Sequence, residues 1–159
     1  AVRKTDGKSD LIIGTRKGLA IRFNEEDVRD TGRTAKGVIG IRLLKGDEVV
    51  SAEVAEEKTA ILTVTEKGQG KRSPIGEYRV QGRGGKGVIS IKTTEKGGKA
   101  VGLMQVRDED EVVMITSSGK IIRTVAKDIS LHGRNTQGVR LMDVGEDKVV
   151  SIAKVVEKD

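Results

Sequence analysis

Gln81-Gly82-Arg83-Gly84-Gly85-Lys86-Gly87-Val88 recurs in two further versions along the chain. It places two cations among four glycines and opens directly into the apolar run Val88-Ile89-Ser90-Ile91. The related stretches are Gly32-Arg33-Thr34-Ala35-Lys36-Gly37-Val38 and Gly133-Arg134-Asn135-Thr136-Gln137-Gly138-Val139. A pattern that returns in this way predicts a repeat protein.

The spacing of the three versions supports the repeat. Chance similarity drifts out of register, whereas a structural unit keeps its offsets. Offsets of 50 and 51 residues separate the members of four sets, namely Gly18, Gly68 and Gly119; Arg22, Arg72 and Arg123; Arg33, Arg83 and Arg134; and Gly37, Gly87 and Gly138. We therefore expect one domain over residues 1–159, built from units of approximately 1–57, 58–108 and 109–159.

Each unit contains four short strand-like runs. A first run, at 11–13, 61–64 or 112–115, reaches a glycine turn and a second run, which predicts a β-hairpin. The third run follows the glycine-basic stretch at 38–41, 88–91 or 139–142, and the fourth lies at 48–52, 100–103 or 148–152. Helical periodicity is poor, and Asn24 to Arg29 would form at most one turn. Four strands in about 50 residues are typical of propeller blades, so we predict an all-β fold.

The number of units is low for a closed ring. Ordinary propellers use about 4 to 8 blades. Three blades are expected to be either a fragment or half of a ring, whose open strand edges need covering. The run from Val149 to Val156 would be the last strand of the third unit or the first of a neighbour.

The amino-acid composition indicates some classes of partner and argues against several kinds of site. The net charge of +6 and pI of 9.6 suggest a polyanionic partner, although a merely soluble basic domain would also have them. The chain has no cysteine and one histidine, which argues against disulfides, thiolate chemistry and zinc sites of the Cys/His type. No apolar run approaches the roughly 18 residues of a membrane span, and residues 1–10 lack a signal-peptide core, so we expect a soluble, untargeted protein.

Basic residues recur at equal places in the units. Nine Lys or Arg but only two acids lie between Lys67 and Lys99. We expect such charges to follow one rim as a curved track that binds and bends duplex DNA through its phosphates. Alternatively, they simply solvate the strand faces. The candidate contacts are Arg83 and Lys86 as the central pair, with Arg16, Lys17, Arg22, Arg33, Lys36, Lys71, Arg72, Gln81, Gly84, Gly85, Gly87, Arg123 and Arg134.

No catalytic constellation is found. Phe23 and Tyr78 are the only aromatic residues, which argues against readers of single strands that stack bases on rings. Tyr78 corresponds to Val28 and Ile129 in the other units, so we expect it to pack in the core. His132 is expected in an exposed loop, and the acids at 108–111 in a solvated turn. No nucleotide-binding fingerprint is present. We expect no cofactor and no metal.

The stretches 81–87, 86–92 and 133–139 together resemble the C-terminal domain of DNA gyrase A, across essentially the whole chain and most closely its last three blades. The resemblance implies a β-pinwheel, a ring of usually six blades with exchanged strands, whose basic perimeter wraps duplex DNA. This wrapping supports negative supercoiling by an ATP-dependent type II topoisomerase. The domain itself would be non-catalytic, in the bacterial cytoplasm with the nucleoid. Its implied partners are duplex DNA, the rest of gyrase A and, through it, gyrase B.

Two departures from this family are visible. Its box normally reads Gln-Arg-Arg-Gly-Gly-Lys-Gly in the first blade, whereas Gly82 replaces an Arg here. The domain that cuts DNA, with its catalytic tyrosine, has no counterpart in these residues. Three alternatives remain open: the C-terminal domain of the A-type subunit of topoisomerase IV, a propeller-like protein-interaction scaffold, and a homodimer that closes the ring.

Overall fold

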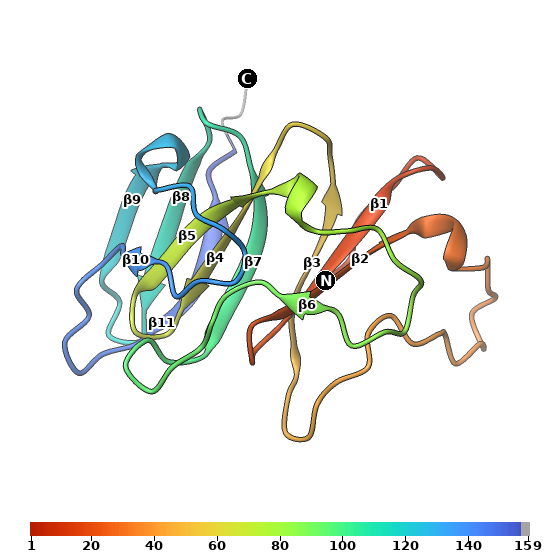
Figure 1. Ribbon diagram of the computed structural model, residues 1–159, viewed down its shortest axis with the longest axis horizontal. Coiled ribbons are helices and arrows are strands. Elements are labelled where there is room, and N and C mark those ends of the chain that lie inside the picture. The colour runs from red at the N-terminus through yellow and green to blue at the C-terminus, as the bar shows by residue number, and fades with distance from the viewer. Residues whose placement is uncertain (157–159) are drawn as a thin grey trace.

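The computed structural model describes residues 1–156 and contains three antiparallel sheets, one for each repeat unit (Figure 1). The first sheet is built from β1 (Asp10–Thr15), β2 (Leu19–Asn24) and β3 (Val49–Ala55), the second from β4 (Ala60–Thr65), β5 (Gln69–Pro74) and β7 (Ala100–Val106), and the third from β8 (Glu111–Thr116), β9 (Ile121–Val125) and β11 (Val149–Lys154). The 3₁₀ turns η1 (Glu25–Asp27), η2 (Ile75–Glu77) and η3 (Ala126–Asp128) are the only helical elements among these residues. The all-β prediction is confirmed, and so is the single turn after Asn24.

Each sheet is centred on the predicted hairpin. The repeated glycines Gly18, Gly68 and Gly119 close these hairpins with φ of 85°, 79° and 88°. Only glycine adopts this left-handed region without strain, which explains its return at equal offsets. The fourth strand-like run then pairs with the first strand of the same unit, as β3 does with β1.

Neighbouring sheets exchange a strand. The strand β6 (Val88–Ile89) belongs to the second unit but pairs with β2 of the first, and β10 (Val139–Arg140) of the third unit pairs with β5 of the second. A Cβ atom added at Gly87 would lie 2.4 Å from the carbonyl oxygen of Ala20, and one at Gly138 would lie 2.5 Å from that of Gly70. The glycine before each exchanged strand is therefore required by this close approach.

The two ends of the chain lack this exchange. The predicted strand at 38–41 is wrong, because those residues have no preceding sheet to pair with among the described residues and are not extended into a ladder. The third sheet correspondingly has three strands, and the outer edge of β9 is unpaired within residues 1–156. Ile39 and Ile121, at these two ends, are 65% and 62% exposed. The expectation of open edges is borne out in this part of the chain.

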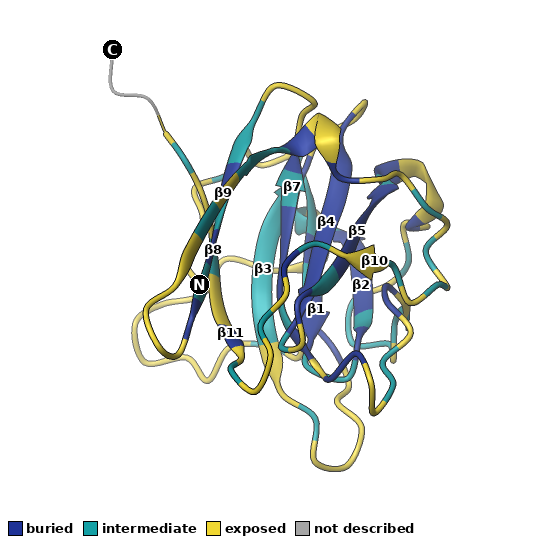
Figure 2. Cartoon of the chain, turned by 90° about the vertical axis from the view of Figure 1, so that its left-hand side faces the viewer, coloured by how far each residue is buried: buried dark blue, intermediate teal, exposed yellow. Residues whose placement is uncertain are grey.

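The hydrophobic core lies between neighbouring sheets. One cluster joins the second and third units through residues such as Leu62, Val64 and Met114, and another joins the first and second through Ile12, Ile61 and Tyr78. Burial is most complete in β4, which is dark blue along its length in Figure 2, whereas β9 and β11 are partly exposed. The middle unit therefore depends on both of its neighbours for its core.

Tyr78 has the packing role that its repeat equivalents predict. It is 1% exposed, and its hydroxyl lies 2.8 Å from the Ser90 hydroxyl, which in turn lies 3.1 Å from that of Thr63. Burial raises the pKa of the Tyr78 phenol above its usual value.

The sheet order fixes which side of the molecule is the rim. The exchanged strands lie at one edge of their sheets, and β3 and β7 lie at the other. These inner strands contact each other, since the Leu103 backbone N–H donates to the Ser51 hydroxyl at 2.9 Å. The glycine-basic stretches that precede β6 and β10 consequently run along the outer rim.

Candidate nucleic-acid interface

The glycine-basic stretch at 81–87 is held against the first unit by its backbone. The N–H of Gln81 donates to Arg22 and that of Gly84 to Gly40, at 2.9 and 2.7 Å, while Gly85 accepts from the N–H of Arg42 at 2.8 Å. Gly84 and Gly87 both have positive φ, of 81° and 78°. The glycines thus let the stretch follow the neighbouring unit closely and leave the charged side chains to project from it.

Arg83 and Arg134 use their guanidinium groups to hold the preceding unit. Arg83 donates to the carbonyl oxygens of Asp27 and Ile39, at 3.0 and 2.7 Å. Arg134 repeats this with the equivalent carbonyls of Glu77 and Ile89, at 3.2 and 2.6 Å. Both arginines are half-buried. These two candidates therefore join units, and only part of each side chain faces outward.

Arg33 occupies the same place in the first unit but is exposed and makes no side-chain hydrogen bond within residues 1–156. The reason is geometric, because no preceding unit stands beside it in this part of the chain. Identical sequence positions thus produce a bound arginine in the second and third units and an unbound one in the first.

Three further candidates are buried, which corrects the expectation that every repeated cation lies on the rim. Arg22, Arg72 and Lys71 are only 6%, 7% and 0% exposed. Arg22 bonds to Asp10 and Glu57 and to the carbonyls of the second unit's turn. Arg72 bonds to Asp108 and to the carbonyls of Ile129 and Lys127. A buried guanidinium needs such partners, so these arginines connect units and do not face a ligand.

Lys71 is a lysine where the other units have Ile21 and Ile122. Its ammonium group donates to the carbonyl oxygens of Gly133 and Arg134, in the stretch that leads to β10. Burial lowers the pKa of Lys71 to about 8, with Arg134 acting in the same direction and Glu77 opposing it.

The remaining repeated cations of the candidate set are on the surface but engaged. Arg123 forms an ion pair with Glu111, and Arg16 forms one with Glu48 at 2.7 Å. The ammonium group of Lys17 donates to the carbonyl oxygen of Lys45. Exposed pairs of this kind contribute little to stability, so a phosphate can compete for these cations.

Lys36 and Lys86 are the candidates that fit the rim prediction directly, since both are exposed and make no side-chain hydrogen bond or ion pair with the described residues. Other exposed cations outside the candidate set lie beside them. Arg42 is bonded through its backbone to Gly85, and Lys92 to Thr136 at 2.8 Å, so each lies next to the following glycine-basic stretch. The signal that could have identified them is the same equal spacing, in the pairs Arg29 and Arg79, Arg42 and Lys92, and Lys17 and Lys67.

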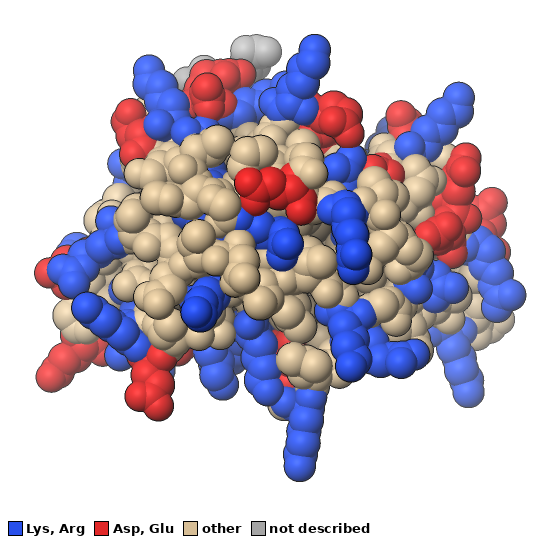
Figure 3. All heavy atoms as spheres, viewed as in Figure 1, with Lys and Arg blue, Asp and Glu red and all other residues tan. Residues whose placement is uncertain are grey.

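These residues form a basic rim, which we define as Lys17, Arg29, Arg33, Lys36, Arg42, Lys67, Arg79, Lys86 and Lys92. In Figure 3, Lys and Arg side chains crowd the lower edge of the molecule under the first and second units. The surface has the charge and the extended shape that suit a phosphate backbone.

Gln81 and His132 lie at equivalent places and are half-buried. Their backbone N–H groups donate to the carbonyls of Arg22 and Arg72, at 2.9 and 2.8 Å. His132 lies in a loop as expected, but it is half-buried and not exposed, and its Nε2 atom is covered by protein. Gln81 therefore positions the stretch that follows it and does not project toward a ligand.

The acidic run at 108–111 serves as a set of ion-pair partners. Asp108, Asp110 and Glu111 pair with Arg72, Lys154 and Arg123. Within residues 1–156, no group of three or more His, Cys, Asp or Glu side chains is arranged to hold a metal ion. No helix in the same range has the length and apolar character to cross a membrane.

Comparison with known proteins gives matches to each of the three units. The family model described as "DNA gyrase C-terminal domain, beta-propeller" matches residues 9–56, 59–107 and 110–155. The gyrase A protein of Staphylococcus epidermidis is 48% identical over 162 residues, and that of Staphylococcus aureus is 45% identical over 161. Each alignment covers 100% of this chain but 18% of the relative, so the chain spans under a fifth of their length.

Two solved structures also match this chain. "Structure of DNA gyrase A C-terminal domain" superposes with a TM-score of 0.89 at 32% identity, and covers 96% of this chain and 52% of that one. "Crystal structure of the C-terminal domain of DNA topoisomerase IV" superposes with a TM-score of 0.92 at 28% identity, and covers 98% of this chain and 49% of that one. Both solved chains are about twice as long as this one.

Proposed function

We propose a function from one premise, which is that the chain belongs to the DNA gyrase C-terminal domain family. The chain binds duplex DNA along the basic rim, without reading its sequence, and bends the duplex around the sheets. It acts as the non-catalytic wrapping part of a type II topoisomerase. We assign it to gyrase, since the gyrase A relatives are 45–48% identical over the whole chain and, of the two solved structures, the gyrase domain is 32% identical against 28% for topoisomerase IV.

The observation that carries the proposal is the state of the rim cations. Lys36 and Lys86 stand at equal places in successive units, are exposed, and have no acidic partner among the described residues. A cation held free of internal partners is available to neutralise a phosphate and release its counterion. The backbone bond from Arg42 to Gly85 places a cation of the first unit beside Lys86 of the second.

Arg83 and Arg134 act differently in this proposal. They hold the carbonyls of the preceding unit, so each sets the position of its own glycine-basic stretch, and Arg83 thereby positions Lys86. Sequence-independent binding follows because phosphate contacts carry no base information.

The test is the salt dependence of duplex binding. The double variant Lys36→Ala with Lys86→Ala should lower the slope of log K against log salt by about 1.8, since each lost phosphate contact changes it by about 0.9. Lys8→Ala with Lys127→Ala is the matched control, because it removes the same charge from exposed lysines off the rim. Equal slopes for the rim variant and the control would contradict the proposal, and so would binding that depends on the base sequence.

The wider setting is also part of the proposal. Since the relatives are far longer, we propose that this domain works with the rest of gyrase A and, through it, with gyrase B. The complete ATP-dependent enzyme would use the wrap to introduce negative supercoils in the bacterial cytoplasm, in association with the nucleoid.

The open edges are proposed to receive further blades of the same kind. Val38 stands at the place of Val88 and Val139, which pair with Ala20 and Gly70, and the corresponding residue of the third sheet is Ile121. The free end of the first unit is thus complementary to the free edge of β9. In the longer protein, neighbouring blades would occupy both. For the chain alone, a homodimer can close the ring, and light scattering on the DNA complexes of the same experiment gives the number of chains.

A further inference from the structure

Most of the basic residues of the rim have no basic equivalent in the third unit. Four sets of equivalent rim positions carry Lys or Arg in the first two units and a neutral or acidic residue in the third, with every position exposed except the half-buried Lys17. These sets are Lys17, Lys67 and Ser118; Arg29, Arg79 and Ser130; Lys36, Lys86 and Gln137; and Arg42, Lys92 and Asp143.

The backbone contacts give the order of these residues along the rim. Arg42 is bonded to Gly85, next to Lys86, and Lys92 is bonded to Thr136, next to Gln137. A ligand following the rim would therefore meet Lys36, Arg42, Lys86 and Lys92 in turn. It would then meet Gln137 and Asp143.

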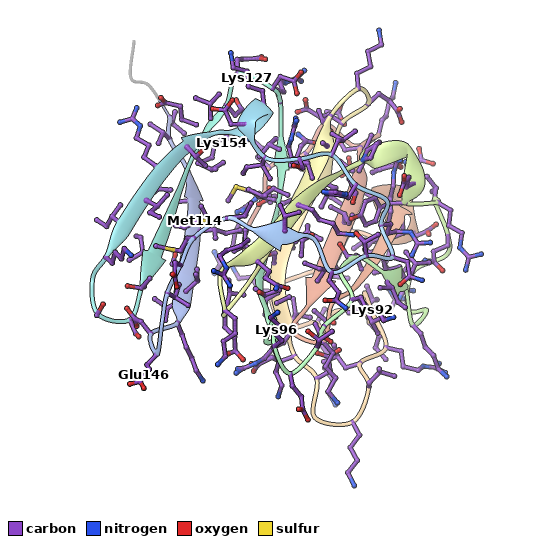
Figure 4. All side chains as sticks on the ribbon, turned by 60° about the vertical axis from the view of Figure 1, so that its left-hand side comes forward. Lys92, Lys96, Met114, Lys127, Glu146 and Lys154 are labelled. Atoms are coloured by element: carbon purple, nitrogen blue, oxygen red, sulfur yellow. The ribbon has the colours of Figure 1, made fainter. Side chains whose placement is uncertain are left out.

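The loops at the adjacent end of each sheet also have fewer cations and more acids in the third unit than in the first two. The segments 16–19 with 42–48, and 66–69 with 92–99, each contain four cations and two acids. The equivalent segments 117–120 with 143–148 contain two cations and three acids. Figure 4 shows Lys96 and Glu146 at the same end of neighbouring units, with Lys127 at the opposite end.

The cations that the third unit does have are placed elsewhere. Arg134 holds the carbonyls of Glu77 and Ile89 in the second unit. Arg140 lies on β10, where it pairs with Gln69 of β5, and so belongs to the second sheet. Lys120 donates to the carbonyl oxygen of Asp143. The Arg140 side chain is exposed without a partner among the described residues, so the cations end with Lys92 and Arg140 at the edge of the second sheet, and Asp143 follows.

We propose that the duplex follows the rim over the first and second units and leaves it at the third, between Lys92 and Asp143. This inference rests on the proposed function and adds a direction and an end to the DNA path. Exposed charges interact over a Debye length of about 10 Å at 0.1 M salt, so the track is set by local cations and not by the net charge. The acids Asp143, Glu146 and Asp147 repel phosphates and turn the duplex away.

Cross-linking can locate the end of the path. Because the sequence has no cysteine, the single variants Lys45→Cys, Lys96→Cys and Glu146→Cys each place one photoreactive group in the same loop of successive units. With a duplex of random sequence, the first two should cross-link well, and Glu146→Cys should yield several-fold less. Glu109→Cys, at the far end of the third sheet, gives the background. A yield at Glu146 equal to that at Lys96 would overturn the inference, while failure of the unsubstituted chain to bind duplex would count against the proposed function itself.

A charge reversal tests the same point without removing a contact. Asp143→Lys should extend the track and steepen the salt slope by about 0.9, the value for one new phosphate contact. Glu109→Lys is the matched control, since it makes the same change of charge on an exposed residue off the rim. If the two variants bind the duplex alike at every salt concentration, the path does not end where we place it.

Discussion

Equivalent arginines lie at the join between the second and third units and at the free edge of the third sheet, but they differ in burial and in hydrogen-bond partners. At the join, Arg72 is 7% exposed and bonds to Asp108 and to the carbonyls of Ile129 and Lys127. At the free edge, the side chain of Arg123 is 57% exposed and pairs only with Glu111 of its own hairpin among the described residues. The difference is the presence of the next unit's turn.

The comparison shows that a repeated cation in this fold is first a connector between units. Arg22, Arg72 and Arg123 occur at equal offsets, yet only the last is on the surface. Repetition alone therefore does not distinguish a residue that binds a ligand from one that binds the neighbouring repeat. In a stacked repeat, each unit's contacts are completed by its neighbours.

The largest expected effect comes from removing the buried member of this pair. Arg72→Ala should lower the free energy of unfolding by about 3–4 kcal/mol, because it leaves the carbonyls of Ile129 and Lys127 without their donor, at about 1–3 kcal/mol each, while the exposed Asp108 carboxylate stays hydrated. Arg123→Ala should cost about 0–1 kcal/mol, as an exposed ion pair does. Urea denaturation followed by circular dichroism measures both. Similar losses in the two variants would mean that burial at the join does not strengthen the contact.

A smaller difference is expected between the glycines at the join and at the free end. Gly87 and Gly37 have similar φ of 78° and 74°, but an added Cβ meets the Ala20 carbonyl at 2.4 Å in one case and nothing within 4 Å in the other. Gly37→Ala should cost about 1 kcal/mol from backbone strain alone. Gly87→Ala should cost about 2–3 kcal/mol because the clash is added. Denaturation midpoints test this, and equal costs would show that the exchanged strand moves away freely.

Much of the fold can be predicted from the sequence, because each unit's hairpin is a local structure. The turn glycines Gly18, Gly68 and Gly119, together with the apolar runs around them, indicate hairpins that the structure confirms. The run at 38–41 has the same strand-like pattern as its equivalents and is not a strand. Its pairing depends on a preceding unit, which no local pattern contains.

The candidate interface is predicted less well, for the same reason. The sequence shows that Arg22 and Lys86 are both basic residues with basic equivalents in other units. Whether each side chain is buried depends on which unit packs against it. Lys86 is exposed, while Arg22 is closed in by the second unit's turn. Arg42 is a repeated cation in the sequence as well, with Lys92 at its equivalent place, but a candidate set centred on the glycine-basic stretch leaves both out.

The smallest expected effect is the change in stability with pH that is due to Lys71. Lys71 lies at the join between the second and third units. The residues at its place in the first and third units are Ile21 and Ile122, which do not titrate. The pKa of Lys71 is lowered from 10.5 to about 8 in the folded chain, with burial as the main cause. Between these values the unfolded chain holds the proton more tightly, so stability rises with pH through this window. Below pH 8 both states are protonated, and the contribution is constant.

Lys71→Met removes this titration and keeps the approximate length of the side chain. The stability of the parent relative to this variant should increase between pH 8 and 10, by at most about 1.4 kcal/mol for each pH unit. The neutral amine can still donate to the carbonyls of Gly133 and Arg134, so the join itself is expected to persist. A relative stability that falls over this range would mean that these two carbonyls favour the ammonium form more than burial disfavours it. The join would then attract the charge of Lys71, as it attracts that of Arg72.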